Sequence, residues 1–377
     1  MSKMKRKAII KKYLKANGFY LMQRDLIIDG LKSSTDISIV IPAYNEQLCL
    51  PRLFRSLDHQ SYQNFEVIAV DNGSTDRTKE VVSLWQRRVN YPLYLVTKFK
   101  KGAANARKRG MDEVLLRVAA RGNDFPFHLI VTTDADATPA YNWLEKMRLK
   151  AKNYRSVAQA GTHQADPEVD LAIEEKLSIK NYFNLIPSII ESFSRKNIGV
   201  IKMSGPNAAF EIEAYAAGDG IRQEYDEGTG LVKLNEVNSL GKRIKQCVYP
   251  VIPMEVRVTT SKRRQLKEIL EGGDSYFPGG FLERDRFNVV REDERELLKS
   301  ALESIDKNAW LKYRQKIITI VLNNFILSSF VKGEVNPRTA KLNTQINKLI
   351  SSFTTPEVLV ASDLLTLIIK QFARVTT

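Results

Sequence analysis

Two aspartates separated by one residue, Asp134 and Asp136, form the pair in this sequence whose spacing points most directly to chemistry. They follow His128–Thr133, an apolar and β-branched run that predicts a buried strand. Carboxylate oxygens are hard ligands that suit Mg²⁺ or Mn²⁺, above all where the cation also binds a diphosphate. A solvated turn can carry the same pair, so the position directly after a strand is what favours a metal site.

A second polar turn follows the strand that Ile37–Ile41 predicts. Pro42 fixes the backbone where this strand ends. Tyr44 offers a ring that could stack on a nucleobase and a hydroxyl that could bond to it. An ordinary strand-to-helix turn with Asn45 as the helix N-cap explains the same residues, so this turn alone is not evidence for a site.

A third polar turn begins at Asp71, after the strand predicted for Phe65–Val70. The Asp71 carboxylate could accept a hydrogen bond from a nucleobase N–H or from a ribose hydroxyl. The alternative is a glycine turn in which Ser74 or Thr75 caps the next helix and Asp76 lies in its first turn.

Strands and helices alternate from residue 36 onward, which predicts an α/β fold with a mostly parallel sheet and helices on both faces. A third strand is expected at Leu93–Thr97, and Thr138 with Pro139 resembles a helix start. In such sheets ligands bind outside the carboxyl ends of the strands. We therefore expect the three turns, with Asp71 and Asp134, to meet at one edge of the sheet.

Positive charge is concentrated in two places. Lys and Arg number 58 against 43 Asp and Glu, a formal charge of +15, and most of the excess lies in residues 1–35 and 98–110. Such charge attracts nucleic acid, anionic lipid or phosphorylated substrates. The aromatic-spaced basic motifs of nucleic-acid readers are missing from the sequence, so we expect no nucleic-acid partner. With only Cys49 and Cys247, neither a disulfide framework nor a cysteine zinc site is available.

The N-terminal charge has two interpretations. Residues 1–16 predict a short helix, apolar on one face and rich in lysine on another, that Asn17 and Gly18 end. It is either a solvated helix or a basic amphipathic helix that contacts an anionic membrane. Neither a secretory signal nor a membrane-spanning segment is evident, since the apolar run Ile317–Val331 is too short. We expect a cytoplasmic protein, with peripheral contact at the inner face of the membrane as an option.

Together the motifs carry a resemblance. VIPAYNE, FEVIAVDNGSTD, KGAANARKRG and VTTDAD, in this order, resemble glycosyltransferase family 2. The resemblance implies a GT-A fold, a nucleotide-sugar donor and inversion of the anomeric centre. It implies a catalytic domain over residues 36–260, with a basic extension over 1–35. Beyond the resemblance, the residue pattern predicts a loop and a mainly helical region over 261–377, which could be a lipid-facing surface, a homodimer contact or a packed core.

The resemblance also assigns residues on the donor side. Asp136 matches the principal metal ligand, and Asp134 matches the aspartate that faces the ribose or the metal, which is Mn²⁺ or Mg²⁺. Asp71 matches the aspartate that recognises the base, and Arg107 the basic residue that approaches the nucleotide. Lys108 departs from the asparagine that is common in the family. The implied donor-binding residues are Pro42, Ala43, Tyr44, Glu46, Asp71, Arg107, Asp134, Ala135 and Arg263, the last in a loop that could close over the diphosphate or simply start a solvated helix.

The acceptor side matches less regularly. Gly205 and Asn207 resemble the family's G-x-N loop, and His163 either lines the acceptor pocket or is structural. Alignment on Leu231 places Glu227 at the family's catalytic glutamate, but Asp226 remains an alternative base.

The function implied is metal-dependent transfer of a sugar, with UDP as the expected nucleotide, to a hydroxyl in glycan, polysaccharide or glycolipid synthesis. The alternatives are a non-catalytic relative that acts as a scaffold and a nucleotidyltransferase. The latter would need a glycine-rich phosphate loop near the first strand, which VIPAYNE lacks.

Overall fold

The computed structural model describes mainly residues 3–18, 35–98, 102–121, 126–154, 157–161, 203–222, 236–254 and 256–261, with a few shorter segments. The chain forms two compact units. One consists of Met1–Gln164, Ile201–Ser261 and Pro278–Arg291, and the other of Ala165–Val200, Lys262–Phe277 and Glu292–Thr377. Most described residues belong to the first unit, which carries all the predicted donor-binding residues except Arg263.

A seven-stranded sheet forms the centre of the first unit, in the order β12-β6-β9-β4-β1-β2-β3. Only β9 runs antiparallel to its neighbours. The mostly parallel α/β sheet predicted from the sequence is therefore confirmed. The strands are β1 (Ile37–Ala43), β2 (Phe65–Asp71), β3 (Leu93–Thr97), β4 (Leu129–Thr132), β6 (Ala158–Ala160), β9 (Ala208–Glu211) and β12 (Val251–Pro253).

The register of the sheet brings the predicted turns together. Ala43 at the end of β1 pairs with Asp71 at the end of β2, and Val40 pairs with Thr132 near the end of β4. The strand order reverses at β1, because the chain runs outward to β3 and then returns to the other side of β1 as β4. Such a reversal leaves an opening beyond the carboxyl ends of the strands, where ligands of α/β sheets bind.

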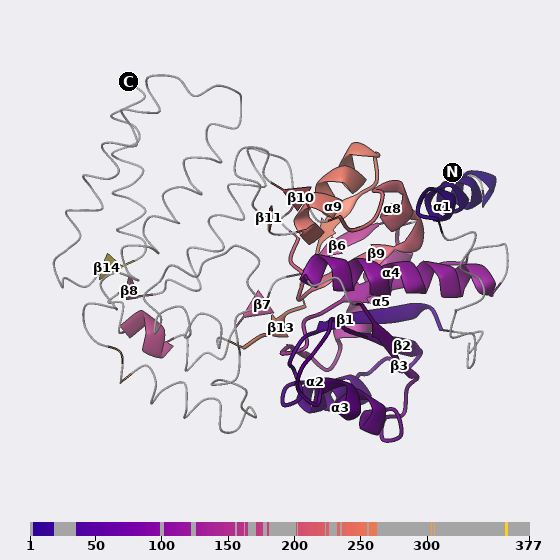
Figure 1. Cartoon of the computed structure of the whole chain (residues 1–377). Coiled ribbons are helices and arrows are strands. Elements are labelled where there is room, and N and C mark those ends of the chain that lie inside the picture. The colour runs from indigo at the N-terminus through magenta and orange to yellow at the C-terminus, as the bar shows by residue number, and fades with distance from the viewer. Residues whose placement is uncertain are drawn as a thin grey trace, which may run out of the picture. The chain divides into compact units, whose positions relative to one another are not determined.

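Helices cover both faces of this sheet (Figure 1). Val40 of β1 faces the core beneath α4 (Ala103–Ala120), α8 (Ile212–Ala217) and α9 (Glu236–Gln246). Ile39 and Ile41 face the opposite core, beneath α2 (Leu50–Asp58), α3 (Thr78–Trp85) and α5 (Trp143–Lys152). The apolar face predicted for α2 is confirmed, because Leu50, Leu53, Phe54 and Leu57 are all buried.

Two predicted helix starts are wrong. The N-cap of α3 is Arg77 rather than Ser74 or Thr75, and the helix begins at Thr78, because the Ser74 and Thr75 side chains bond to Asn45 in the preceding turn. Thr138 and Pro139 form the short strand β5 rather than the start of a helix, and α5 begins later, at Trp143. In both places a contact distant in sequence replaces the local capping pattern.

The remaining strands are short. β5 (Thr138–Pro139) and β7 (His163–Gln164) both pair with β13 (Val258–Thr259), and β10 (Glu224–Tyr225) pairs with β11 (Val232–Lys233). In the second unit, β8 (Ile179–Lys180) pairs with β14 (Leu359–Val360). None of the helices in the described part of the chain is long and apolar enough to cross a membrane.

The N-terminal helix α1 (Lys3–Ala16) is part of this first unit rather than a solvated extension. Ile10, Tyr13 and Leu14 are buried in the same core as α4 and α8. Arg6 forms ion pairs with Glu211 and Glu213 at the start of α8. The predicted apolar face of the helix is confirmed, but it packs against the protein.

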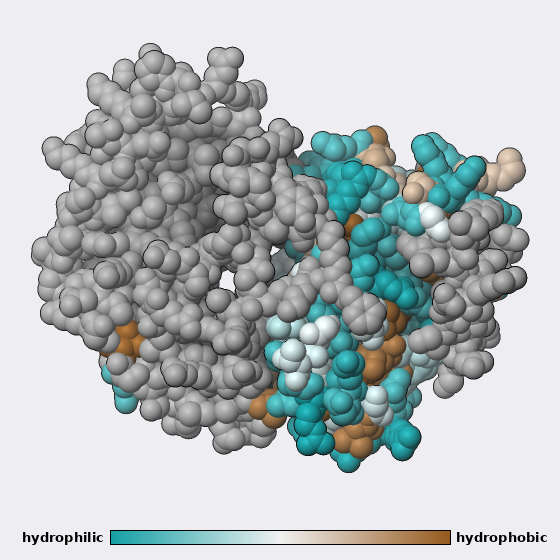
Figure 2. Space-filling view, in the orientation of Figure 1, coloured by the Kyte–Doolittle hydropathy of each residue, from teal (hydrophilic) through white to brown (hydrophobic). Residues whose placement is uncertain are grey.

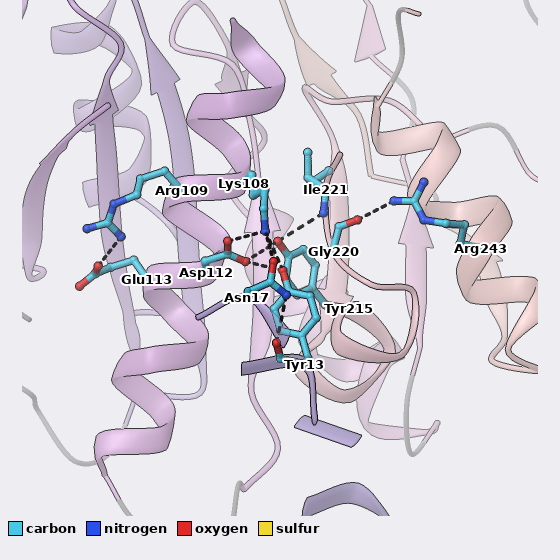
Figure 3. Close-up of polar contacts among 10 residues, drawn as sticks. All are labelled: Tyr13, Asn17, Lys108, Arg109, Asp112, Glu113, Tyr215, Gly220, Ile221 and Arg243. Carbon is cyan, nitrogen blue, oxygen red and sulfur yellow. Dashed lines mark hydrogen bonds and ion pairs between the residues drawn. The ribbon is translucent and has the colours of Figure 1, made fainter. Parts of the chain in front are cut away.

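A polar network fastens the end of α1 to α4 and α8 (Figure 3). Asp112 accepts hydrogen bonds from Tyr13 at 2.6 Å and from Tyr215 at 3.0 Å, and it pairs with Lys108 at 2.7 Å. The Lys108 ammonium also donates to Asn17, in the residue pair that ends α1. Lys108, where the family often has asparagine, thus joins α4 to α1.

A second buried network lies at the amino end of the strands, opposite to the predicted site. The hydroxyl of Ser38 lies 2.7 Å from a Glu66 oxygen and 2.8 Å from Nε2 of His128. Arg117 and Arg121 of α4 both pair with Glu66. Burial lowers the pKa of His128 to about 3, and the positive charge of Arg121 adds to the effect.

This shift predicts a pH dependence of stability. Below the ordinary histidine pKa of about 6.5, the unfolded chain takes up a proton that folded His128 does not bind. The free energy of unfolding should therefore fall as the pH drops from about 6.5 towards 3, by up to about 1.4 kcal/mol per pH unit from this group. Urea unfolding of His128→Gln at several pH values between 7 and 4 should show a shallower slope than the wild type.

The exposed His59 offers a matched control, since His59→Gln should keep the wild-type slope. Parallel curves for the wild type and His128→Gln would show that burial of His128 does not set the pH dependence.

Candidate functional site

Asp71 lies at the end of β2, at the edge where the strand order reverses, and is 1% exposed. Its two carboxylate oxygens accept hydrogen bonds from the backbone N–H groups of Gly73 and Ser74, each at 3.2 Å. Gly73 has a φ of +78°, which glycine adopts without steric cost. The turn itself therefore fixes the orientation of the Asp71 carboxylate.

Asn45 holds the turn after β1 against the turn after β2. Its side-chain oxygen accepts from the Thr75 backbone N–H at 2.8 Å, and its amide nitrogen donates to the Thr75 hydroxyl at 3.1 Å. Its backbone N–H donates to the Ser74 hydroxyl at 3.0 Å. The alternative reading of Asn45 as a helix N-cap is wrong, because α2 begins after Cys49 and Asn45 bonds across to the second turn.

Neighbouring residues add to the contacts between these two turns. The backbone N–H of Glu46 donates to the Thr78 hydroxyl at 2.8 Å, and Glu46 is 2% exposed. Pro42 and Tyr44 are only partly buried, so they line the surface of the same turn, while Ala43 is buried. The residues that the resemblance assigned to the first donor loop thus lie directly beside Asp71.

Asn72 joins three elements at this edge. Its backbone N–H donates to the Ala43 carbonyl at 2.9 Å, and its side-chain nitrogen donates to the Lys98 carbonyl at 2.8 Å. Its side-chain oxygen accepts from the Gly102 backbone N–H at 2.7 Å, at the start of α4. Sequence analysis did not single out Asn72, and its place between Asp71 and Gly73 was the only available signal.

Asp134, Ala135 and Asp136 form the turn after β4. The backbone N–H of Ala137 donates to the Asp134 carbonyl at 3.0 Å, and Arg52 of α2 donates to the Asp136 carbonyl at 2.9 Å. Asp136 is 5% exposed and Ala135 is 3% exposed, so the turn is packed rather than solvated.

The donor set at this turn suits one class of cation. Among the described residues, no group of three or more His, Cys, Asp or Glu side chains could hold a metal ion. The carboxylates that the described residues offer to a cation at this edge are therefore the two on this turn, Asp134 and Asp136. That set fits Mg²⁺ or Mn²⁺, which take one or two protein carboxylates and complete their shell with water and substrate phosphates.

Arg107 lies behind Asp134 rather than open to solvent. It is buried and forms ion pairs with the carboxylates of Asp134 and Glu236 through two different nitrogens. Burial acts to lower the pKa of Arg107, but the two carboxylates outweigh it and raise that pKa overall. Arg107 is therefore a fixed positive charge inside the site, and Glu236 is a site residue that sequence analysis missed.

The G-x-N loop approaches the same charge. A Cβ atom on Gly205 would lie 2.6 Å from a guanidinium nitrogen of Arg107, so only glycine leaves room for it. Asn207 is fully buried, accepts a hydrogen bond from Trp143 at 2.9 Å and donates to the Val256 carbonyl at 2.8 Å. In the described geometry Asn207 ties β9 to α5 and to the segment before β13.

Other predicted site residues cannot be placed. Asp226, Glu227 and Arg263 lie outside the described residues, as does the side chain of His163, whose backbone forms part of β7. Their proposed roles stay predictions.

Solved structures with a similar chain trace include a mannosyltransferase from Pyrobaculum calidifontis in complex with GDP-Man and Mn²⁺, and TarS from S. aureus in complex with UDP-GlcNAc. The first is 18% identical with a TM-score of 0.44, and the match covers 92% of this chain and 90% of the mannosyltransferase chain. The second is 14% identical with a TM-score of 0.39 and covers 77% of this chain and 81% of its own.

Curated relatives match over shorter stretches. Amylovoran biosynthesis glycosyltransferase AmsB of Erwinia amylovora is 44% identical over 78 residues, which are 20% of this chain and 26% of the relative. A GalNAc(5)-diNAcBac-PP-undecaprenol beta-1,3-glucosyltransferase of Campylobacter jejuni is 30% identical over 80 residues, 20% of this chain and 25% of the relative. The chain thus matches about a quarter of the length of each of these relatives.

The turns that form the site lie within the part of the chain with the clearest family signal. Residues 38–217 match the family model described as glycosyl transferase family 2, so this part of the chain is a glycosyltransferase family 2 domain.

Proposed function

We propose that this protein transfers a sugar, with inversion, from a nucleoside-diphosphate sugar to an acceptor hydroxyl. The observation that carries the proposal is the meeting of Asp71, Asp134 and Asp136 at the point where the strand order reverses. Each carboxylate sits on a turn that other residues hold in place. A family 2 domain supplies the context in which such an edge binds a nucleotide sugar.

The donor would lie across the turns after β1, β2 and β4. Asp71, whose carboxylate the turn holds in place, would accept a hydrogen bond from the base, and the partly exposed Tyr44 in the neighbouring turn would offer a stacking surface. Uracil is the base expected from the family resemblance. Asp134 and Asp136 would hold Mg²⁺ or Mn²⁺, which when bound neutralises the charge that develops on the leaving diphosphate.

Inversion needs one displacement. The acceptor oxygen attacks C1 of the sugar from the side opposite the nucleotide, the bond from C1 to the phosphate oxygen breaks, and its electrons leave with the diphosphate. A carboxylate takes the proton from the acceptor hydroxyl, and Glu227 or Asp226 is the candidate. We propose the same division of the chain as the sequence predicts, with residues 36–260 catalytic. The acceptor is a hydroxyl of a glycan, polysaccharide or glycolipid.

The contribution of Asp136 can be measured directly. Asp136→Ala should lower donor hydrolysis or transfer by at least about 100-fold, because it removes a carboxylate from the cation that balances the leaving diphosphate. The assay is release of nucleotide from a panel of nucleotide sugars with Mn²⁺ or Mg²⁺, with and without chelator. Glu80→Ala, an exposed carboxylate on α3, should behave as the wild type. Full activity of folded Asp136→Ala would contradict the metal assignment.

The base can be identified by isosteric substitution. Glu227→Gln should lower kcat by about 10²–10⁴-fold with donor affinity retained, since general-base catalysis is worth about this much. Asp226→Asn should then have a small effect. If the two variants exchange these results, Asp226 is the base; if both keep wild-type kcat, neither residue takes the proton.

We also propose a reversible contact of α1 with an anionic membrane. The helix carries lysines on the side that does not pack on the protein, including Lys11, Lys12 and Lys15, and this part of the surface is largely hydrophilic (Figure 2). Because Ile10 and Tyr13 are buried in the core, the contact would be electrostatic rather than an insertion of the apolar face. Lysines near an anionic surface contribute about 1 kcal/mol each.

Vesicle sedimentation at low and high salt tests this contact. The triple variant Lys11→Gln, Lys12→Gln, Lys15→Gln should bind vesicles of phosphatidylglycerol and phosphatidylcholine at least about ten-fold more weakly, and salt should abolish the difference. A matched triple variant at Lys79, Lys146 and Lys152, on the opposite side of the sheet, should bind as the wild type. Equal binding by the two triple variants would remove α1 as the membrane contact.

A further inference from the structure

Glu236 lies in the first turn of α9, in a part of the sequence that no motif marks. Its side chain reaches Arg107 on α4, and only 12% of it is exposed. The same guanidinium pairs with Asp134, whose side chain is 20% exposed at the donor edge. One buried cation thus connects a carboxylate of the predicted donor site with a carboxylate that has no assigned role.

The two pairs divide the guanidinium between them. One terminal nitrogen, Nη1, donates to Oε1 of Glu236, and the other, Nη2, donates to Oδ1 of Asp134. A guanidinium has its donors in a planar fork and readily binds one carboxylate through both terminal nitrogens. Here Glu236 occupies one arm of the fork, so Asp134 receives only the other.

This division determines what Asp134 can offer to a ligand. Within the described residues, Oδ2 of Asp134 has no hydrogen-bond partner, whereas Oδ1 is held by Arg107. A bidentate pair with Arg107 would engage both oxygens. The monodentate pair leaves Oδ2 for a cation or for the ribose of a donor.

The packing around Arg107 makes the arrangement depend on Glu236. The Nε atom of Arg107 is buried without a hydrogen-bond partner among the described residues, so the two carboxylates provide its described polar anchors. Gly205 closes the remaining side, because its Cα lies so near that a Cβ would be 2.8 Å from the central carbon of the guanidinium. The guanidinium therefore has little room to withdraw towards Gly205.

We propose that Glu236 is a positioning residue that keeps Arg107 monodentate on Asp134 and so leaves one Asp134 oxygen for the nucleotide-sugar and its cation. The inference rests on the proposed function, since it concerns the donor side of that same site. Loss of the Glu236 charge frees one arm of the fork, which then turns onto Oδ2 of Asp134. The donor side loses a ligand although Asp134 itself is intact.

The test is the binding of Mn²⁺ with UDP, measured by calorimetry and by the electron paramagnetic resonance signal of free Mn²⁺. Glu236→Gln should weaken this binding by about 10–100-fold, the range expected when a residue that orients a metal ligand is lost. Glu80→Gln removes a first-turn glutamate from α3 and controls for the helix dipole. It should bind as the wild type.

A double-mutant cycle separates positioning from a general loss of structure. In the Asp134→Asn background, Glu236→Gln should have almost no further effect on Mn²⁺ and UDP binding, because the oxygen it protects is already gone. Additive losses in the cycle would overturn the proposal, as would wild-type affinity in folded Glu236→Gln. If Glu236→Gln does not fold, Glu236→Asp takes its place in the cycle with the same expected non-additivity.

The proposed function fails by a different result. Wild-type protein that binds neither UDP nor GDP with Mn²⁺, and releases nucleotide from no sugar donor, would overturn the donor site itself. Wild-type binding together with an unaffected Glu236→Gln would overturn only the positioning role.

Discussion

The buried charge of Arg107 is the constraint around which the site is arranged. A guanidinium removed from water must be paired, because an isolated buried charge costs about 3–5 kcal/mol or more when its partner is lost. Asp134 and Glu236 provide the pairing, and they come from the turn after β4 and from the start of α9. Gly205 is restricted to glycine by the same guanidinium. Elements far apart in sequence are therefore fixed around one side chain of α4.

Several residues along the helix α4 fix neighbouring elements in this way. Gly110 allows it to lie directly on the sheet, since a Cβ there would come within 2.4 Å of Val40. On one side Arg107 pairs with Asp134 at the predicted donor edge, and on another Asp112 accepts a hydrogen bond from Tyr13 and fastens α1. Near its end Arg117 pairs with Glu66 in the buried network at the amino end of the strands. The position of α4 thus links the site to the N-terminal helix and to the core.

The sheet was predictable, and so was the edge at which its polar turns meet, because both follow from local patterns. A β-branched run such as Ile37–Ile41 has few alternatives to a buried strand, and alternation with helices implies parallel pairing. The helix starts at Ser74 and Thr138 were not predictable in the same way. Their polar groups satisfy partners in other turns or strands, and a capping pattern read along the chain cannot show that.

The ion pair between Arg107 and Glu236 could not be predicted from the sequence either. Glu236 carries no motif, and its relation to Arg107 spans 129 positions in the sequence. Only the packing of α9 against the α4 face of the sheet brings the two together. The sequence does contain a cluster of basic residues that ends at residue 110. Such a cluster predicts a nearby anion, but it does not show whether that anion is a ligand or a carboxylate of the protein itself.

The same pairs change the meaning of the net charge of +15. In the basic stretch 98–110, Arg107 pairs with Asp134 and Glu236, Lys108 pairs with Asp112, and Arg109 pairs with Glu113. Much of the charge expected to face a diphosphate is thus neutralised inside the protein. Under the proposed function, neutralisation of the leaving group would therefore depend more on a cation at Asp136 than on these side chains. The lysines of α1, in contrast, lie at a surface whose apolar face is already occupied, so their charge is directed outward.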